Sequence, residues 1–450
     1  MMQFITLLDY FLLPFFLLVL YFIVSFIRNR DYPAGHPWRS YFMTGFTLKI
    51  VGAIGIGLIY QYYYGGGDTA NYWFHANLIN SSFAESTVKW FNLILGIPPW
   101  YSGEYSAYIS KMLWYDSPPE YTVCAIAAFF GIFTFNCYLL IAVLFGAFAY
   151  TGLWAMFKTF ALKYPAYTKY IAWCCLYIPS TVMWGSGLFK DTLCMCGLGW
   201  MTYGAFRMLI NRDFRFRNLF ITLLGFLLIA RIKLYILLAF IPALALWILF
   251  SYSHNIQSRL TRNVVKVMVI FACIGGFAVF SQKFALELGK YSLENVAKTS
   301  YSTNINIAMI SGDEGSTYNL GTMDPSIGGM LKKFLPAINV TLFRPYLWET
   351  RKVLQFVNAI EATLFLWVTI KILFSVGLIR TWKTIAGDPT IQFCLIFTII
   401  FAFAIGLSSG NFGTLSRYRI PCLPFYGIAL VLIYYKNKPV TNNILALNFR

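Results

Sequence analysis

The sequence has few charged residues, and acidic ones are especially scarce. Only 12% of its 450 residues are charged, whereas a typical soluble domain has about a quarter. Aspartate and glutamate together number 17, against 35 lysines and arginines. A soluble globular protein would need more charge to cover its surface. Because 59% of the residues are hydrophobic and the mean hydropathy is +0.63, a disordered chain is excluded as well. The composition predicts an integral membrane protein.

Cysteines are thinly spread, and no internal repeat is visible. All nine cysteines lie in or beside apolar runs rather than in a long loop, so we expect no structural disulfide. Cys194 and Cys196 would point to different faces of a helix, which favours packing over metal binding. The lack of a repeat argues against a transporter built from inverted repeats.

About eleven apolar runs could cross the hydrocarbon core, which is about 30 Å thick. The predicted fold is therefore an all-α integral membrane protein, a polytopic bundle of about 11 transmembrane helices in a single transmembrane domain over residues 1–450. The third and ninth runs exceed one crossing, so tilt or an interfacial extension is expected there. The runs are Phe4–Ile27, Phe42–Tyr62, Tyr121–Phe157, Tyr170–Trp184, Thr192–Ile210, Leu219–Ala230, Leu234–Phe250, Val264–Ser281, Val353–Leu378, Ile391–Leu407 and Ile420–Tyr435.

The basic residues predict how the bundle is oriented. With the N-terminus outside and the C-terminus in the cytoplasm, every inner loop is short and basic, as the positive-inside rule requires. Only Asp31, Asp213 and Asp388 oppose those cations. The net charge of +18 is thus mainly a topology signal. Because no soluble basic face exists, we expect the lipid bilayer and no nucleic acid as a partner.

Asp68 is the main candidate for acid–base chemistry. It lies in the first of two long outer loops, residues 63–120, directly after three glycines that allow a tight turn and leave the carboxylate uncrowded. There it could take a proton from an acceptor hydroxyl. It could equally cap a helix beginning at Thr69, and the two roles are compatible. The aromatic residues that follow suit interfacial helices. His75, two helical turns on, could form a metal pair with Asp68, although an ordinary interfacial histidine is the simpler interpretation.

Arg231 and Lys233 interrupt the apolar stretch Leu219–Phe250. As one helix this stretch would be about 48 Å long, too long for one crossing, and both cations would lie near mid-bilayer. Two spans joined at 231–233 avoid this. The first would then be only about 18 Å long, so we expect both cations to be recessed in an outward-facing cavity, where a lipid phosphate is the obvious ligand. Simple snorkelling to head groups is the alternative.

Three further outer segments carry cations suited to phosphate. Arg417, Tyr418 and Arg419 directly precede Ile420-Pro421, where proline can occupy a first helical turn. Lys190 and Asp191 open the fifth span in a similar way, and helix starts favour anions. In the second long loop, residues 282–352, Arg344 and Glu349 follow a polar stretch at 311–316; they either contact substrate or form a plain surface ion pair.

Lys49, Glu361 and Lys371 fall inside apolar runs and could make polar contacts inside the bundle.

These features resemble the GT-C superfamily, polytopic glycosyltransferases that use polyprenyl-phosphate-linked sugars. The shared pattern is a carboxylate in the first large outer loop, interfacial helices in that loop and arginines at later outer turns. The stretch Gly413–Pro421 is similar to the "R-Y-R-x-P" turn of bacterial relatives and of some envelope polysaccharide polymerases. The residues around Pro179, Trp184–Gly187 and Lys190 are similar to an outer turn of such envelope-glycan proteins.

The resemblance implies roles for individual residues. Asp68 would be the catalytic acid of the first loop. The lipid-phosphate contacts would be Lys190, Arg231, Lys233, Arg344, Arg417 and Arg419, and the supporting residues Asp191, His75, Glu349 and Tyr418. Two departures matter: an extra span precedes the first outer loop, and Asp68 lacks the adjacent second acid of many members. The need for a divalent cation, and the role of Asp68 as base, therefore stay open.

The function expected from this resemblance is sugar transfer at the outer face of the inner (plasma) membrane. The donor would be a sugar on an isoprenoid (undecaprenyl-type) phosphate, and the acceptor an envelope glycan or glycolipid. A lipid-linked polysaccharide polymerase or ligase is an alternative enzyme function. A transporter or flippase for such a lipid is an alternative without enzymatic activity. Polar residues crowd at the outer end rather than crossing the bundle, which argues against transport.

Overall fold

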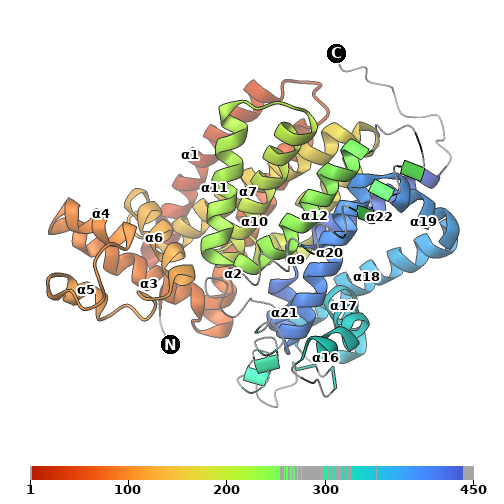
Figure 1. Cartoon of the computed structure of the whole chain (residues 1–450). Coiled ribbons are helices and arrows are strands. Elements are labelled where there is room, and N and C mark those ends of the chain that lie inside the picture. Colours follow the sequence, from red (N-terminus) through yellow and green to blue (C-terminus); the bar gives the residue numbers. More distant parts are fainter. Residues whose placement is uncertain are drawn as a thin grey trace. The chain divides into compact units, whose positions relative to one another are not determined.

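The computed structural model describes residues 3–253, 326–350 and 352–438, together with single residues scattered between 258 and 324. The described parts are helical, and the one extended pairing among them is an isolated bridge between Thr317 and Asn411 (Figure 1). Most of the expected span Val264–Ser281, the polar stretch 311–316 and Cys273 lie outside the described residues.

The described structure separates into two compact units, and the expectation of a single transmembrane domain over residues 1–450 stays a prediction. Unit 1 comprises Met1–Thr159, Cys175–Met208 and Asp213–Leu234, and unit 2 comprises Phe160–Cys174, Leu209–Arg212 and Tyr235–Arg450. The helices of unit 1 are α1 (Leu7–Asp31), α2 (Arg39–Ile59), α3 (Asp68–Ser81), α4 (Thr87–Leu95), α5 (Ser106–Ile109), α6 (Pro118–Phe133), most of α7 (Tyr138–Lys163), α9 (Pro179–Trp184), α10 (Lys190–Ala205) and α11 (Phe216–Ile232). Those of unit 2 are most of α8 (Thr168–Leu176), α12 (Leu234–Ser253), α16 (Ile327–Lys332), α17 (Phe334–Phe343), α18 (Val353–Val376), α19 (Leu378–Gly387), α20 (Pro389–Ser408), α21 (Phe412–Tyr418) and α22 (Leu423–Asn437).

Seven helices in the described part of the chain are long and apolar enough to cross a membrane, and the bent pair α21–α22 would make an eighth. The seven are Leu7–Asp31, Arg39–Tyr64, Tyr138–Lys163, Lys190–Ile210, Leu234–Ser253, Val353–Val376 and Pro389–Ser408. The prediction of a helical, multi-pass membrane protein is confirmed at this level. The count of eleven spans stays a prediction.

Two of the expected runs are each divided into two helices. The run Tyr121–Phe157 comprises α6 and α7, because Phe135 and Asn136 between them adopt positive φ angles of 52° and 58°, which a right-handed helix cannot include. The run Tyr170–Trp184 comprises α8 and α9. Here Pro179 begins the second helix, and the residue before a proline avoids helical angles.

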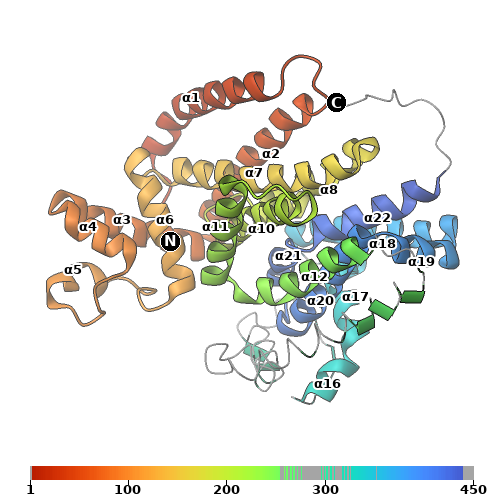
Figure 2. The ribbon, with the colours of Figure 1, turned by 45° about the horizontal axis from the view of Figure 1, so that its top comes forward.

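Glycines let the long helices of unit 1 approach closely. Helices α7, α10 and α11 lie side by side in both views (Figures 1 and 2). A Cβ atom on Gly199 of α10 would lie 1.9 Å from the carbonyl oxygen of Gly152 on α7, and one on Gly225 of α11 would lie 2.6 Å from that of Gly197. Small residues at helix contacts are typical of membrane bundles, where dispersion between close backbones replaces the hydrophobic effect.

The first long loop folds into short helices, α3 to α5, beside α6 (Figure 2). In α4, Trp90 and Leu93 are buried, while Val88, Phe91 and Leu95 are 67%, 54% and 67% exposed. A short helix with a buried apolar side and an exposed apolar side is typical of one that lies in the membrane interface. The short helices expected in this loop are present, and their position at the membrane interface stays a prediction.

Candidate functional site

Asp68 is the first residue of α3, and its carboxylate is half-buried in the first helical turn. The helix therefore begins one residue earlier than an Asp68 cap would require, and Gly67 occupies the N-cap position. A carboxylate in the first turn is stabilised by the positive end of the helix dipole. The tight turn expected from the glycines is present, because all three have left-handed φ angles that other residues rarely adopt: Gly65 69°, Gly66 143° and Gly67 115°.

A tyrosine ring connects the start of α3 to the start of α10. A Cβ atom on Gly67 would lie 3.0 Å from the ring of Tyr60, and that ring lies 5.2 Å, centroid to centroid, from the ring of Phe189. Gly67 directly precedes Asp68, and Phe189 directly precedes Lys190. The structure thus brings the predicted acid and the predicted cation of the fifth span to one end of unit 1.

The start of α7 lies at this same end. The hydroxyls of Thr69 and Tyr138 form a hydrogen bond of 2.7 Å, and the backbone N–H of Leu139 donates to Asp9 Oδ1 at 2.8 Å. Since Asp9 is in the first turn of α1, the N-terminal ends of α1, α3 and α7 meet here. We call this end of unit 1, defined by Asp68, Lys190, Asp191, Arg231 and Lys233, the Asp68 end.

Lys190 forms an ion pair that was not predicted from the sequence. Its ammonium lies 2.5 Å from Glu120 Oε1 in the first turn of α6, and the two side chains are 19% and 20% exposed. Burial by itself would raise the pKa of Glu120, but the hydrogen bonds from Lys190 and Ser117 lower it below its usual value. Lys190 is thus held at the surface of the Asp68 end, with part of its charge already compensated.

Lys233 lies at the break between α11 and α12, where the length argument placed it. Helix α11 ends at Ile232 and α12 begins at Leu234. The Lys233 side chain is 6% exposed, as a recessed cation should be, and its ammonium lies 2.5 Å from Asp191 Oδ1, itself 1% exposed. The anionic group beside this buried cation is therefore a carboxylate of the chain itself.

Arg231 differs from its neighbour Lys233. Helix α11 has 17 residues, about 25 Å of helix, so it reaches further than the 18 Å expected. Arg231 is exposed rather than recessed. Among the residues that the structure describes, its guanidinium has no hydrogen bond or ion pair. It is the cation of the Asp68 end that is open to a ligand.

In unit 2, Arg419 is an interior residue. Its side chain is 1% exposed, and Nη2 donates to Glu361 Oε1 at 3.1 Å and to the carbonyl of Asn358 at 3.4 Å. Nη1 donates to the carbonyls of Arg344 at 3.0 Å and Thr341 at 3.3 Å. The guanidinium joins α17, α18 and the end of α21, so these contacts give it a structural role.

Arg344 and Glu349 form the ion pair that was one of the two alternatives. Arg344 Nε lies 3.1 Å and 3.0 Å from the two carboxylate oxygens, and both side chains are 20% exposed. The pKa of Glu349 is lowered because the hydrogen bonds from Arg344 and the Tyr346 amide outweigh the effect of burial. The Arg344 guanidinium also lies 5.2 Å from the ring of Phe412 in α21.

Arg417 and Tyr418 lie half-buried in the last turn of α21. The N-terminus of this helix is capped by Asn411, whose Oδ1 accepts the N–H groups of Gly413 at 2.6 Å and Thr414 at 3.2 Å. Those amides are thus occupied by the cap. Pro421 lies in the break before α22, which is bent by 69° from α21, rather than in a first helical turn.

His75 is a packed residue. It is 2% exposed, and its Nε2 accepts the backbone N–H of Leu113 at 3.2 Å, while its ring lies 5.3 Å from that of Trp114. Burial lowers the pKa of His75 to about 4. No group of three or more possible metal ligands occurs in the described parts of the chain. The simpler interpretation of His75 fits these contacts.

Two of the three charged residues inside apolar runs make interior contacts. Lys49, 1% exposed, donates to the carbonyls of Thr181 and Gly185, each at 2.8 Å, and Glu361 pairs with Arg419. Lys371 is exposed and lies 4.7 Å from the ring of Trp367. The eight described cysteines are buried free thiols.

Comparison of the chain with protein-family models, with curated proteins and with solved structures finds no match.

Proposed function

We propose that the protein is a GT-C-like membrane glycosyltransferase that transfers a sugar from an isoprenoid (undecaprenyl-type) phosphate to a glycan or glycolipid. The observation that carries the proposal is the Asp68 end. There the carboxylate of Asp68 at the start of α3 lies at the same end of unit 1 as three cations, of which Lys190 and Lys233 also face carboxylates of the chain. A carboxylate near cations is what transfer from a phosphate requires, because one group removes a proton and the others stabilise the leaving anion.

In the proposed reaction, Asp68 removes the proton of an acceptor hydroxyl. The acceptor oxygen forms a bond to the anomeric carbon of the donor sugar, while the bond from that carbon to the phosphate oxygen breaks. The electron pair of the broken bond leaves with the isoprenoid phosphate, which becomes a dianion. Arg231, exposed at the end of α11, is the first contact for this phosphate, and Lys190 is the second.

Lys233 and Asp191 have a positioning role in this proposal. Their ion pair fixes the end of α11 against the start of α10, and so fixes where Arg231 and Lys190 lie. The site is assigned to the outer face of the inner (plasma) membrane, with the N-terminus outside and the C-terminus in the cytoplasm. This orientation follows from the basic inner loops.

The test is a transfer assay with the full chain in proteoliposomes. The donors are radiolabelled undecaprenyl-phosphate hexoses, and a membrane extract of the source cells supplies the acceptor. We expect release of undecaprenyl phosphate and label in a glycan or glycolipid. Asp68→Asn should slow transfer about 10²- to 10⁴-fold, as loss of a general base does, without weakening binding of undecaprenyl phosphate.

The matched control is Asp116→Asn, which removes an exposed carboxylate from the same loop. Equal rates for Asp68→Asn and the wild type would contradict the proposed base. Release of a diphosphate in place of a monophosphate would favour the polymerase or ligase alternative. Movement of the lipid across the bilayer without any transfer would favour a flippase.

A further inference from the structure

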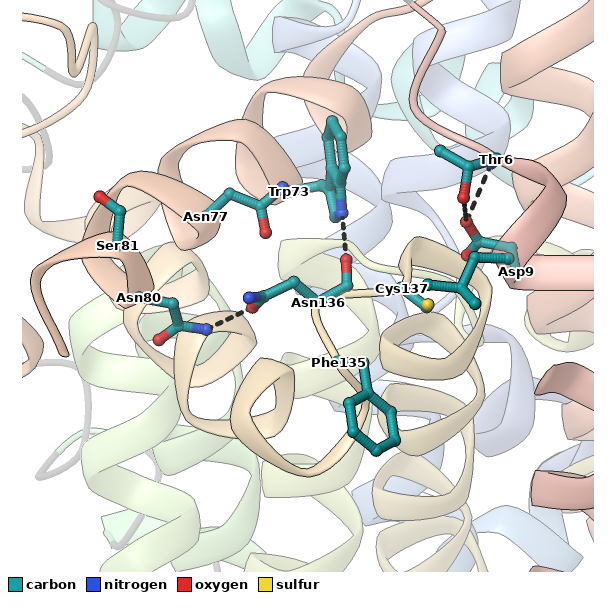
Figure 3. Close-up of a pocket in the computed structure, with 10 residues that line it drawn as sticks. Thr6, Asp9, Trp73, Asn77, Asn80, Ser81, Phe135, Asn136 and Cys137 are labelled. Atoms are coloured by element: carbon teal, nitrogen blue, oxygen red, sulfur yellow. Dashed lines mark hydrogen bonds between the residues drawn. The ribbon is translucent and has the colours of Figure 1, made fainter. Parts of the chain in front are cut away.

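A cavity of about 350 Å³ opens in unit 1, between the start of α1, the middle of α3 and the connection from α6 to α7 (Figure 3). Its volume lies in the range of small-molecule sites. The lining combines carboxamides and hydroxyls with two aromatic rings: Thr6, Leu8, Asp9, Trp73, Asn77, Asn80, Ser81, Phe135, Asn136 and Cys137.

One lining carboxamide fixes the orientation of another. Asn80 Nδ2 donates to the carbonyl of Ala128 at 2.9 Å and to Asn136 Oδ1 at 2.6 Å, and Asn80 Oδ1 accepts the indole N–H of Trp90 at 2.8 Å. Because Asn136 Oδ1 is an acceptor in this network, its Nδ2 group remains as a donor for the cavity. The site is therefore preorganised by the protein itself.

A second carboxamide lacks a partner. Asn77 Oδ1 is buried and has no hydrogen bond within the described part of the chain. In Figure 3 this oxygen points from α3 toward Asn136, into the cavity. A buried acceptor without a donor destabilises the protein, so a ligand that donates a hydrogen bond here would gain affinity.

The cavity carries no charge that is available to a ligand. Asp9 is its one ionisable acid, and its carboxylate accepts from Leu139 N at 2.8 Å and from both the N–H and the hydroxyl of Thr6, at 2.9 and 2.8 Å. No lysine or arginine is among the lining residues. Groups that both donate and accept, without net charge, match hydroxyls rather than phosphates or carboxylates.

The aromatic residues complete this chemistry. Phe135 is 75% exposed and adopts a left-handed φ of 52°, which is rare for a bulky residue. Trp73 is fixed by its indole N–H, which donates to the carbonyl of Asn136 at 2.7 Å. In Figure 3 these two rings lie on opposite sides of Asn136. Rings beside amides suit a ligand with both apolar C–H faces and hydroxyl edges.

We propose that this cavity binds a neutral sugar residue of the acceptor glycan. That the bound sugar belongs to an acceptor glycan rests on the proposed function. That the cavity binds a neutral sugar rests on its lining alone. Asn77 follows Asp68 by nine residues on α3, about 14 Å along the helix axis, so the sugar held here is not the one that reacts. The cavity would hold an acceptor residue distant from the reacting hydroxyl and so align the glycan along α3.

The test measures saccharide binding directly, by saturation-transfer NMR on the full chain in lipid nanodiscs. The probes are the methyl glycosides of glucose, galactose, mannose and N-acetylglucosamine, with methyl glucuronide as the charged comparison. We expect binding of at least one neutral glycoside and at least tenfold weaker binding of the glucuronide. Asn77→Leu should weaken neutral binding about tenfold, the effect of losing one or two hydrogen bonds.

Two further variants distinguish a loss of sugar binding from a loss of folding. Asn71→Leu makes the same change on α3 outside the cavity and should bind like the wild type. Phe135→Ala changes a surface side chain and should weaken binding several-fold. The proposal is overturned if no neutral glycoside binds, if Asn77→Leu and Phe135→Ala bind as well as the wild type, or if the glucuronide binds equally. Neutral binding without transfer would contradict only the proposed enzyme activity.

Discussion

The two units each contain a buried ion pair, and the pairs are built differently. In unit 1, Lys233 presents one ammonium to Asp191 at 2.5 Å, where α11 ends and α10 begins. In unit 2, the guanidinium of Arg419 contacts the Glu361 carboxylate and three backbone carbonyls. These carbonyls belong to Thr341 in α17, to Arg344 directly after α17, and to Asn358 in α18. Both cations are at most 6% exposed, so each depends on its partner to remain charged in the interior.

The difference follows from the shape of the two cationic groups. An ammonium is a compact point charge, whereas a guanidinium is a planar fork with five donors in fixed directions. The fork can reach carbonyls at the end of α17 and within α18, in addition to the carboxylate. Loss of Arg419 therefore affects several buried acceptors at once, while loss of Lys233 or Asp191 removes a buried ammonium–carboxylate contact.

The largest expected effect is that of Arg419→Ala. It leaves Glu361 as a buried charge without its partner and removes the donors of three carbonyls, so we expect a loss of about 3–5 kcal/mol in the free energy of unfolding. The measurement is reversible unfolding in mixed micelles with increasing SDS. Adding Glu361→Leu should recover only part of this loss, because the carbonyls stay unsatisfied. Full recovery of the unfolding free energy would contradict the difference between the Arg419 and Lys233 ion pairs, because it would show that the carbonyl contacts of Arg419 contribute nothing.

Asp191→Ala should destabilise the protein somewhat less, by about 3 kcal/mol, since it removes the carboxylate that faces the buried Lys233 ammonium. The double variant Asp191→Leu with Lys233→Met should return to within about 1 kcal/mol of the wild type, as replacement of a buried pair by apolar residues often does. The same SDS titration measures both. A double variant as unstable as Asp191→Ala would show that the pair has further essential contacts.

A third carboxylate, Asp388, also faces a lysine, and the pH dependence of unfolding can show how much its charge stabilises the protein. Burial would raise its pKa, but hydrogen bonds from Lys436 and Tyr164, the latter at 2.7 and 2.8 Å, lower it below the usual 3.8. Because the pKa is lower in the folded state, the ionised carboxylate stabilises the protein at any pH above the unfolded-state pKa. This stabilisation is lost as the pH falls through the folded-state pKa. Asp388→Asn should therefore cost about 2 kcal/mol at pH 7, and this cost should shrink as the pH falls below the unfolded-state pKa.

This prediction is checked by SDS unfolding of the wild type and Asp388→Asn between pH 7 and pH 3. The two curves of unfolding free energy should run parallel above about pH 5 and converge below about pH 4. A difference that stays constant across this range would mean that the carboxylate charge is not what stabilises the end of α22.

The smallest effect on stability is expected for Arg231→Gln. This side chain is exposed, so the free energy of unfolding should change by no more than about 0.5 kcal/mol. Binding of undecaprenyl phosphate, measured by native mass spectrometry against phosphatidylglycerol, should nevertheless weaken several-fold. Lys371→Gln, an exposed cation of unit 2, is the matched control and should leave binding unchanged. Equal binding by Arg231→Gln would exclude this residue as a phosphate contact.

Interpretation of the sequence was accurate wherever the physical cause is local. The break at Lys233 followed from the length of an apolar run and the energetic cost of two cations in hydrocarbon, and the structure has it there. The glycine turn before Asp68 followed from the conformational freedom of glycine. The division between α6 and α7 was missed because Phe135 and Asn136 interrupt an otherwise apolar run without a proline or glycine to mark the break.

The sequence by itself determined the membrane class, most of the helices and the positions of the cations, because apolar run length and charge placement act within a few residues. Only the tertiary structure decided which cations are already paired. Asp191 and Lys233 are 42 residues apart, and Glu361 and Arg419 are 58 apart. No local pattern predicts such contacts, since they depend on which helix ends meet when the bundle packs. Arg231 is exposed, and no carboxylate among the described residues pairs with it, while Lys233, two residues away, is buried against Asp191.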